Sequence, residues 1–177
     1  MQPFTAVLTE GKVVVPSQSE ADSLMSDGYG RRQGSLYVLE PAESLFNVER
    51  QKISVVDEDT NRALSFQELL KIFSAQDPGV WTRFLVYRDL RTRGFTAVTD
   101  PKGEADLMVY AKDTFMKGPP TIRVFVVSEG SPERLDRLIE LTRRFEAEGL
   151  QLKLAVVDRR GEMVYYGLSE RSFQAAD

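Results

Sequence analysis

The sequence predicts an α/β protein of two domains, the second of which contains a mixed five-stranded sheet with flanking helices. Apolar residues at helical spacing over 80–90 lead into Gly94 and then into the two-residue period of a strand at 95–99. Residues 121–128 are apolar enough for a central strand that is covered on both faces. Residues 75–79 interrupt the pattern. The expected divisions are a first domain at 1–76, a second at 77–172 and a tail at 173–177.

The first domain is expected to combine short strands with three helices. The hydroxyls of Ser17 and Ser65 can each accept a backbone N–H at a helix start, and Glu68 completes a capping box with Ser65. Pro41 suits the first turn of another helix, where no amide is needed. Strands are expected within 4–15 around a Glu10-Gly11 turn and at 35–39 and 52–57, helices at 17–27, 41–50 and 65–74, and a loop at 28–34.

The second domain is expected to begin with a helix of about four turns that Asp77 and Pro78 can start and Gly94 can end. Strands are expected at 95–99, 105–111, 121–128, 150–158 and 163–168, a loop at 112–120, and a helix from Ser131 to Gly149 with Leu135, Leu138, Ile139 and Phe145 facing inward.

Composition excludes several kinds of site. The 177 residues include no cysteine and no histidine, which excludes disulfides, thiol catalysis and the common zinc and copper ligand sets. No loop has the spaced acids of a calcium or magnesium site. Neither a metal nor another cofactor is therefore expected.

Charge and hydropathy set further limits. The net charge of −4 does not by itself indicate nucleic-acid binding, although arginines cluster at 31–32, 83–93, 143–144 and 159–160. No apolar run approaches the ~20 residues of a membrane span, and the N-terminus lacks the basic and apolar blocks of a secretion signal. A cytoplasmic protein without membrane association is expected.

Five segments between residues 30 and 168 carry a family resemblance: SLYVLEPAESLFNVERQKISV, LSFQELL, DPGVWTRFLVYRDLRTRGF, ADLMVY and LKLAVVDRRGEMVYY. Together and in this order they resemble the archaeal tRNA-splicing endonucleases. The resemblance implies a nuclease-like second domain and an enzyme that removes introns from precursor tRNA at bulge-helix-bulge structures. It also implies cleavage without metal, to a 2′,3′-cyclic phosphate and a 5′-hydroxyl.

The resemblance implies three catalytic groups, of which a tyrosine acts as base and a histidine protonates the leaving oxygen. Tyr110, at the end of ADLMVY, holds the tyrosine position. The histidine position holds Pro119 or Pro120. Proline has no proton to give, and histidine is the side chain whose ordinary pKa suits proton transfer near neutrality. Without the family, Tyr110 is interpreted as a strand-end residue with a packed ring and a solvated hydroxyl.

The third implied group is a lysine that stabilises the charge on phosphorus. Anchoring on Ala155 to Asp158 puts Leu150 or Gln151 at its position. Lys153 lies two or three residues later, and a shift of two keeps the same face of a strand, so Lys153 is a candidate substitute. With two of three groups missing, this chain alone is expected to be inactive.

The resemblance therefore implies a structural subunit that pairs with a catalytic tRNA-endonuclease subunit in an α₂β₂ heterotetramer and acts on precursor tRNA. Family members pair through their last β-strands, here represented by Val164, Tyr165, Tyr166 and Leu168. They also insert an acidic hairpin loop into a basic cleft of another unit. The loop at that place is Asp158, Arg159, Arg160, Gly161 and Glu162, which carries two arginines beside its two acids. Without the family, this loop is interpreted as a mixed-charge hairpin that needs no partner.

Other hypotheses remain open at this point. A metal-dependent nuclease would use Glu104, Asp106 and Glu129 with Lys102 nearby, although the usual acid-x-lysine pair is absent. A stand-alone RNA-binding module would hold folded RNA through its arginines and backbone contacts. An interaction protein without RNA contact would need neither.

Overall fold

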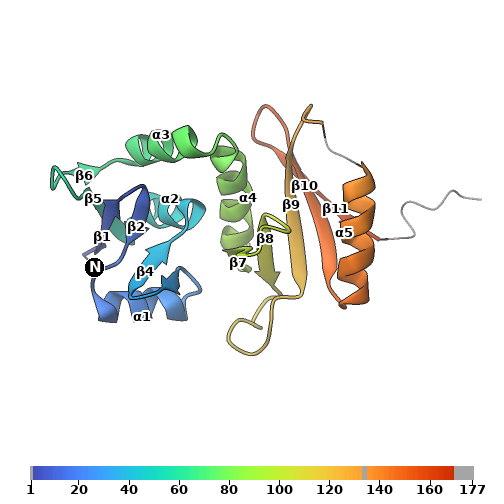
Figure 1. Cartoon of the computed structure of the whole chain (residues 1–177), viewed down its shortest axis with the longest axis horizontal. Helices are drawn as coiled ribbons and strands as arrows, with labels where there is room; N and C mark the ends of the chain where they lie inside the picture. The colour runs from blue at the N-terminus through green and yellow to red at the C-terminus, as the bar shows by residue number, and fades with distance from the viewer. Residues whose placement is uncertain (1, 133–134, 170–177) are drawn as a thin grey trace, which may run out of the picture. The chain divides into compact units, whose positions relative to one another are not determined.

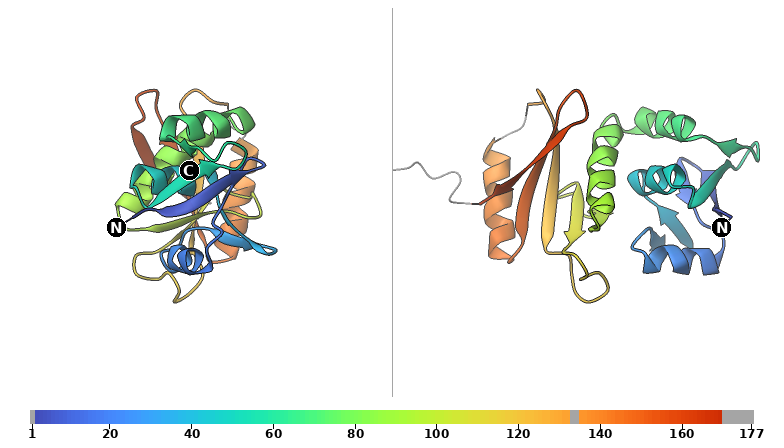
Figure 2. Two further views of the ribbon diagram at one scale, coloured as in Figure 1. Left: turned by 90° about the vertical axis from the view of Figure 1, so that its left-hand side faces the viewer. Right: turned by 180° about the vertical axis from the view of Figure 1, so that it is seen from behind.

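Two units, each with its own sheet, make up the computed structural model of the chain (Figures 1 and 2). The structure describes residues 2–132 and 135–169, so the expected tail at 173–177 lies outside the described residues. The units divide between Arg88 and Asp89, inside helix α4 (Val80–Thr92). Among the described residues no helix is both long enough and apolar enough to cross a membrane.

The first unit contains a six-stranded sheet in the order β3-β4-β2-β1-β5-β6. Strands β1 and β5 are parallel and the other neighbouring pairs are antiparallel. Helix α2 packs against β5 and β2, and α3 packs against α2. The elements are β1 (Phe4–Thr9), β2 (Lys12–Val14), α1 (Gln18–Ser26), β3 (Arg31–Gln33), β4 (Leu36–Leu39), α2 (Pro41–Glu49), β5 (Ile53–Asp57), β6 (Ala63–Leu64) and α3 (Phe66–Gln76).

Strands β3 and β6 were not expected from the sequence, and the prediction of a loop over residues 28–34 is wrong in part. Strand β3 is polar and its side chains do not alternate with apolar ones, so no period marks it. It forms because Gly34, at a φ of 62°, opens a two-residue hairpin loop that brings β3 onto β4. Strand β6 has only two residues and pairs at the sheet edge.

The predicted capping box of α3 is confirmed. The Ser65 hydroxyl accepts the Glu68 amide at 3.3 Å, and the Glu68 carboxylate accepts the Ser65 amide at 2.8 Å. Arg62 donates to Glu68 at 2.8 Å. The bonds that the Glu68 carboxylate accepts, the one from Arg62 first and then those from the Ser65 amide and hydroxyl, lower the pKa of Glu68 to about 2. The start of α3 therefore carries a carboxylate that stays ionised in the folded chain.

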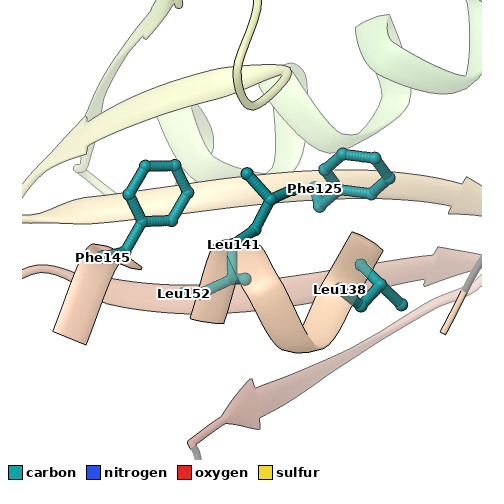
Figure 3. Close-up of a cluster of buried hydrophobic side chains, with 5 residues drawn as sticks. All are labelled: Phe125, Leu138, Leu141, Phe145 and Leu152. Atoms are coloured by element: carbon teal, nitrogen blue, oxygen red, sulfur yellow. The ribbon is translucent and has the colours of Figure 1, made fainter. Parts of the chain in front are cut away.

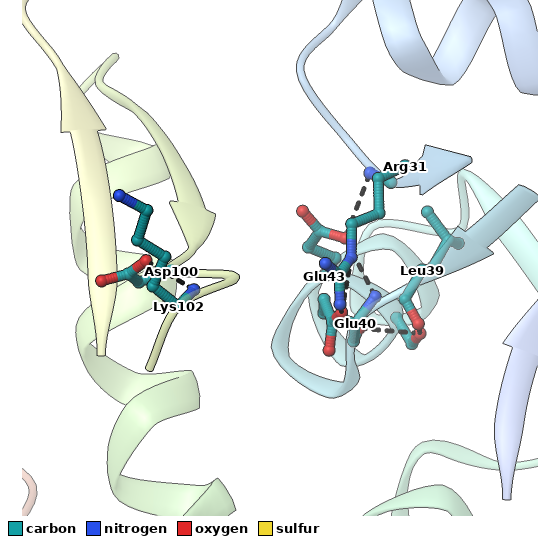
Figure 4. Close-up of polar contacts among 8 residues, drawn as sticks. Arg31, Leu39, Glu40, Glu43, Asp100 and Lys102 are labelled. Carbon is teal, nitrogen blue, oxygen red and sulfur yellow. Dashed lines mark hydrogen bonds and ion pairs between the residues drawn. The ribbon is translucent and has the colours of Figure 1, made fainter. Parts of the chain in front are cut away.

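A second carboxylate pair organises the start of α2 (Figure 4). The buried Glu43 accepts the amides of Glu40 at 3.0 Å and of Gly30 at 3.1 Å. Glu40 in turn accepts a bond from Arg31 at 2.7 Å. The helix start is thus tied to the β3–β4 hairpin through backbone groups that would otherwise lack partners.

The second unit contains the predicted mixed five-stranded sheet, in the order β11-β10-β9-β8-β7. Strands β9 and β10 are parallel, and the other neighbours are antiparallel. Helix α5 covers one face and the last turn of α4 lies on the other (Figures 1 and 2). The elements are β7 (Thr96–Thr99), β8 (Leu107–Tyr110), β9 (Ile122–Ser128), α5 (Leu135–Ala147), β10 (Gln151–Val157) and β11 (Met163–Leu168).

The core under α5 consists of Phe125, Leu138, Leu141, Phe145 and Leu152 (Figure 3). Phe145, in the last turns of α5, is 1% exposed and belongs to this cluster. The prediction that Leu135 faces inward is wrong, because its side chain is 59% exposed. Leu135 shares the helical period of the buried residues, but it lies in the first turn of the helix and is not part of the core under α5.

A polar contact on the other face joins the last turn of α4 to the edge strand β11. The Tyr165 hydroxyl donates to the Asp89 carboxylate at 2.7 Å, and the guanidinium of Arg93 lies 5.6 Å from the centre of the Tyr165 ring. Burial, then the hydrogen bond to Asp89 and then the negative charge of Asp89 raise the pKa of Tyr165 above its ordinary value. This contact fixes the inner face of β11 within the second unit.

Replacing Phe145 by alanine is expected to cost about 3–5 kcal/mol of unfolding free energy, because it leaves a cavity under α5. Chemical denaturation followed by circular dichroism measures this cost. Leu135→Ala on the same helix is the matched control, and it is expected to change stability by about 0.5 kcal/mol or less. Equal costs for the two variants would contradict the described core.

Replacing Tyr165 by phenylalanine is expected to cost about 1–2 kcal/mol near neutral pH through loss of the bond to Asp89. Because the pKa of Tyr165 is raised in the folded chain, its contribution to stability is fully present below the pKa of about 10 that it has in the unfolded chain. It is lost as pH rises through the folded pKa. Denaturation of wild type and variant from pH 7 to 11 should therefore show a shallower alkaline decline for the variant. Parallel declines would contradict the assignment.

Candidate functional site

The ends of three adjacent strands bring the predicted catalytic positions together in the second unit. Val109 in β8 pairs with Ile122 in β9, and Ile122 pairs with Gln151 in β10. The Gln151 amide donates to the Thr121 carbonyl at 2.9 Å. Tyr110 ends β8 and the loop 111–121 leads back into β9, so the tyrosine, histidine and lysine positions of the predicted site meet at one end of the sheet.

Tyr110 packs against the loop that follows it. Its ring and that of Phe115 meet edge to face, with centroids 5.1 Å apart and planes at 88°. The side chain is half-buried. Lys112, in the same loop, lies over the ring of Phe95 at 5.2 Å. Tyr110 is therefore held by its contact with Phe115, and Lys112, the cation nearest to it in sequence, is engaged with Phe95.

The predicted histidine position is occupied by the loop's two prolines, Pro119 and Pro120. Arg123 donates to the Pro120 carbonyl at 3.2 Å, and its guanidinium lies 6.0 Å from the centre of the Phe145 ring. A guanidinium stays protonated at ordinary pH and so cannot exchange a proton in place of an imidazole. Arg123 therefore holds the end of the loop against the sheet and does not replace the proton donor of the predicted site.

The two residues at the predicted lysine position point to different faces of the sheet. Leu150 packs on the core under α5. Because side chains alternate along a strand, Tyr110 and Met108 share that face with Arg123, which pairs with Met108. Gln151 lies on the opposite face. The position that shares a face with Tyr110 is thus apolar.

Lys153 lies on the face opposite Tyr110. It pairs with Val124, and the two lie on the α4 side of the sheet. There Lys153 lines a pocket of about 120 Å³ with Leu90, Arg93, Phe95, Val109, Ile122, Val124 and Tyr165. Lys153 lies two residues after Gln151 and therefore on the same face of the sheet. Its side chain and that of Tyr110 are thus on opposite faces.

The acids considered for a metal site do not converge. Asp106 accepts the Val126 amide at 2.7 Å, and Glu104 forms an ion pair with Arg144 at 3.4 Å. Glu129 is exposed beyond the end of β9. Within residues 2–132 and 135–169, no group of three or more acids could hold one ion. Asp100, which precedes Lys102, accepts the Lys102 and Ala105 amides and shapes the entry to β8 (Figure 4).

The predicted association strand β11 is an edge of the five-stranded sheet. Val164 and Tyr166 share one face of it and are 53% and 52% exposed. Leu168, on the same face, packs against the core under α5. Tyr165 points to the other face, toward Asp89. The apolar surface that β11 leaves open therefore consists of Val164 and Tyr166, beside a strand edge that pairs with no further strand among the described residues.

The loop between β10 and β11 is closed by its own first residue. The Asp158 carboxylate accepts the Arg160 amide at 2.8 Å and the Glu162 amide at 2.9 Å. Gly161 has a φ of 82°, which the turn requires and which glycine adopts without strain. Arg159, Arg160 and Glu162 are exposed. One of the loop's two acids is thus used inside the loop, and its outward charge comes mostly from arginine.

Phe115 and Arg123 support this site but were not identified from the sequence. Phe115 lies in a loop without a period, and Arg123 lies in a strand that otherwise reads as core. The aromatic residue five positions after Tyr110 is a signal that pattern analysis could have used. Arg123 depends on the return path of the loop, and only the structure shows that path.

Comparison with protein families supports the sequence resemblance in both units. Residues 80–165 match the family described as tRNA intron endonuclease, catalytic C-terminal domain. Residues 4–70 match the tRNA intron endonuclease N-terminal domain. The two matches cover the two units in chain order, and the match to the catalytic domain includes Tyr110, the loop 111–121 and the first half of β11.

Individual relatives agree. A tRNA-splicing endonuclease of Methanococcus vannielii is 29% identical over 92% of this chain and 92% of its own length. A tRNA-splicing endonuclease of Pyrococcus abyssi is 32% identical over 78% of this chain and 79% of its own length. One of Methanococcoides burtonii is 29% identical over 91% of this chain but only 45% of its own length, so that relative is about twice as long. On this evidence the chain belongs to the tRNA intron endonuclease family.

Proposed function

We propose that this chain is a non-catalytic, structural subunit of a tRNA-splicing endonuclease. In this proposal it pairs with a catalytic chain in an α₂β₂ arrangement and helps to place precursor tRNA for intron removal at bulge-helix-bulge sites. The observation that carries the proposal is the composition of the site. Of the three catalytic positions, only Tyr110 keeps the family's side chain, and the sequence contains no histidine.

The chemistry of the site supports an inactive chain. Cleavage without metal needs a group to protonate the leaving oxygen, and Pro119 and Pro120 cannot do so. Leu150 is apolar and packs into the core, so the sheet face of Tyr110 has no ammonium group from that position. Losing one positioned acid or base costs about 10²–10⁴ in rate. Losing two groups leaves little that Tyr110 can do alone.

The edge strand supports association with a partner. Val164 and Tyr166 expose apolar surface beside the open edge of β11. An added strand would satisfy the backbone groups of that edge and cover both side chains. A catalytic chain of the same fold has a last strand of matching form. Pairing through β11 would therefore bring in a chain whose own site holds the imidazole and the lysine that are absent from the corresponding positions here.

The test is co-expression with a histidine-bearing homologue from the same organism. A stable complex should form, and it should cut a bulge-helix-bulge RNA that this chain alone leaves intact. Tyr110→Phe in this chain should leave the rate of the complex within about two-fold, because a working catalytic group would cost at least about 10². Cleavage by this chain unaided would overturn the proposal. A 10²-fold loss in the Tyr110→Phe complex would show that Tyr110 takes part in cleavage.

Replacing Val164 by aspartate should weaken association with the catalytic chain by about 30-fold or more, since it puts a charge into an apolar contact. Sedimentation of the mixed chains measures this change. Leu36→Asp is the matched control, because Leu36 is 48% exposed on β4 of the other unit. Association that survives Val164→Asp, or that both variants weaken equally, would contradict pairing through β11.

A further inference from the structure

Nearly all of the arginines that the structure describes make contacts within the chain. Seven form ion pairs with carboxylates: Arg31, Arg32, Arg62, Arg83, Arg88, Arg93 and Arg144. Arg50, Arg123 and Arg137 lie over phenylalanine rings. Arg91 and Arg143 have interactions as well.

Arg159 and Arg160 are the exceptions among the arginines that the structure describes. Their guanidinium groups form no ion pair, hydrogen bond or ring contact with any described residue, and both residues are exposed. They sit at the tip of the β10–β11 hairpin, at one end of the sheet (Figure 1). Two adjacent arginines that pair with no residue of 2–132 or 135–169 therefore occupy the same turn.

The turn that carries them is rigid. The Asp158 carboxylate accepts two backbone amides, the Asp158 amide donates to the Glu162 carbonyl at 2.9 Å, and the Gly161 amide donates to the Asp158 carbonyl at 3.1 Å. Four bonds within five residues fix the backbone, so the two side chains are presented from a preformed base. Preorganisation of this kind reduces the entropy lost on binding.

The charge of the tip excludes one kind of contact and favours another. A basic cleft in a partner would repel two exposed arginines. A phosphate backbone attracts them, and a guanidinium matches a phosphate through two parallel hydrogen bonds. The proposed function supplies such a polyanion in precursor tRNA, and in this respect the inference depends on it.

We infer that the hairpin tip is an RNA contact, in which Arg159 and Arg160 bind backbone phosphates of the precursor RNA. Such contacts fix the position of the RNA without reading its sequence. The contact belongs to a surface separate from Val164 and Tyr166, which face a protein partner in the proposed function. The loop then acts on the substrate and not as an acidic insertion into another subunit.

The test compares Arg159→Gln/Arg160→Gln with Arg31→Gln/Arg32→Gln. The control removes the same charge from an adjacent, exposed pair whose members are ion-paired to Glu40 and Asp22. Fluorescence anisotropy measures binding of a bulge-helix-bulge RNA across salt concentrations, for the full chain alone and in complex with the catalytic chain. The tip variant should lose about ten-fold in affinity, and its salt slope should fall by about 1.5–2.

The control variant should lose less than half of either effect. Equal losses in the two variants, no loss in the tip variant, or no RNA binding by wild type in either form would overturn the inference. Loss of assembly with the catalytic chain in the tip variant would show an acidic protein partner instead. Failure of the wild-type chain to assemble would count against the proposed function, whereas an assembled complex with unchanged RNA affinity would count against the tip alone.

Discussion

The parallel pairing of β9 with β10 is the constraint on which the second unit depends. Two parallel neighbours need a crossover, and α5 provides it, so the start of β10 must lie beside the start of β9. Antiparallel β8 then delivers its last residue to the same end. The meeting of Tyr110 with the loop 111–121 and residues 150–151 thus follows from topology, whichever side chains occupy those positions.

Under the proposed function, this separation of fold from chemistry explains how a site can lose its reactive groups and keep its shape. Leu150 packs on the core where a lysine would need solvent or a counter-charge, and burial of an apolar side chain favours folding. The prolines of the loop restrict its backbone, and Arg123 binds the Pro120 carbonyl. The leucine and the prolines therefore suit the local structure at these positions.

Much of the fold could be predicted from the sequence because its signals are local. The capping box at Ser65, the cap at Ser17 and Gly94 after α4 each fix an element end through nearby backbone groups. Strand β3 escaped because pairing across Gly34 creates it, and Leu135 was misplaced because period alone does not show what lies beneath a helix. The faces of Tyr110 and Lys153 likewise depend on strand register, which no single segment specifies.

The edge of the sheet carries two surfaces with different physical character, and their separation has a consequence. An apolar contact through Val164 and Tyr166 gains from the release of water and depends weakly on salt. Contacts from Arg159 and Arg160 to phosphate weaken steeply as salt rises, because binding releases counterions. Both surfaces belong to the β10–β11 hairpin, and the bond from Tyr165 to Asp89 anchors its second strand. In the proposed complex, assembly and RNA placement can therefore respond to solution conditions independently, although a single turn of chain connects the two surfaces.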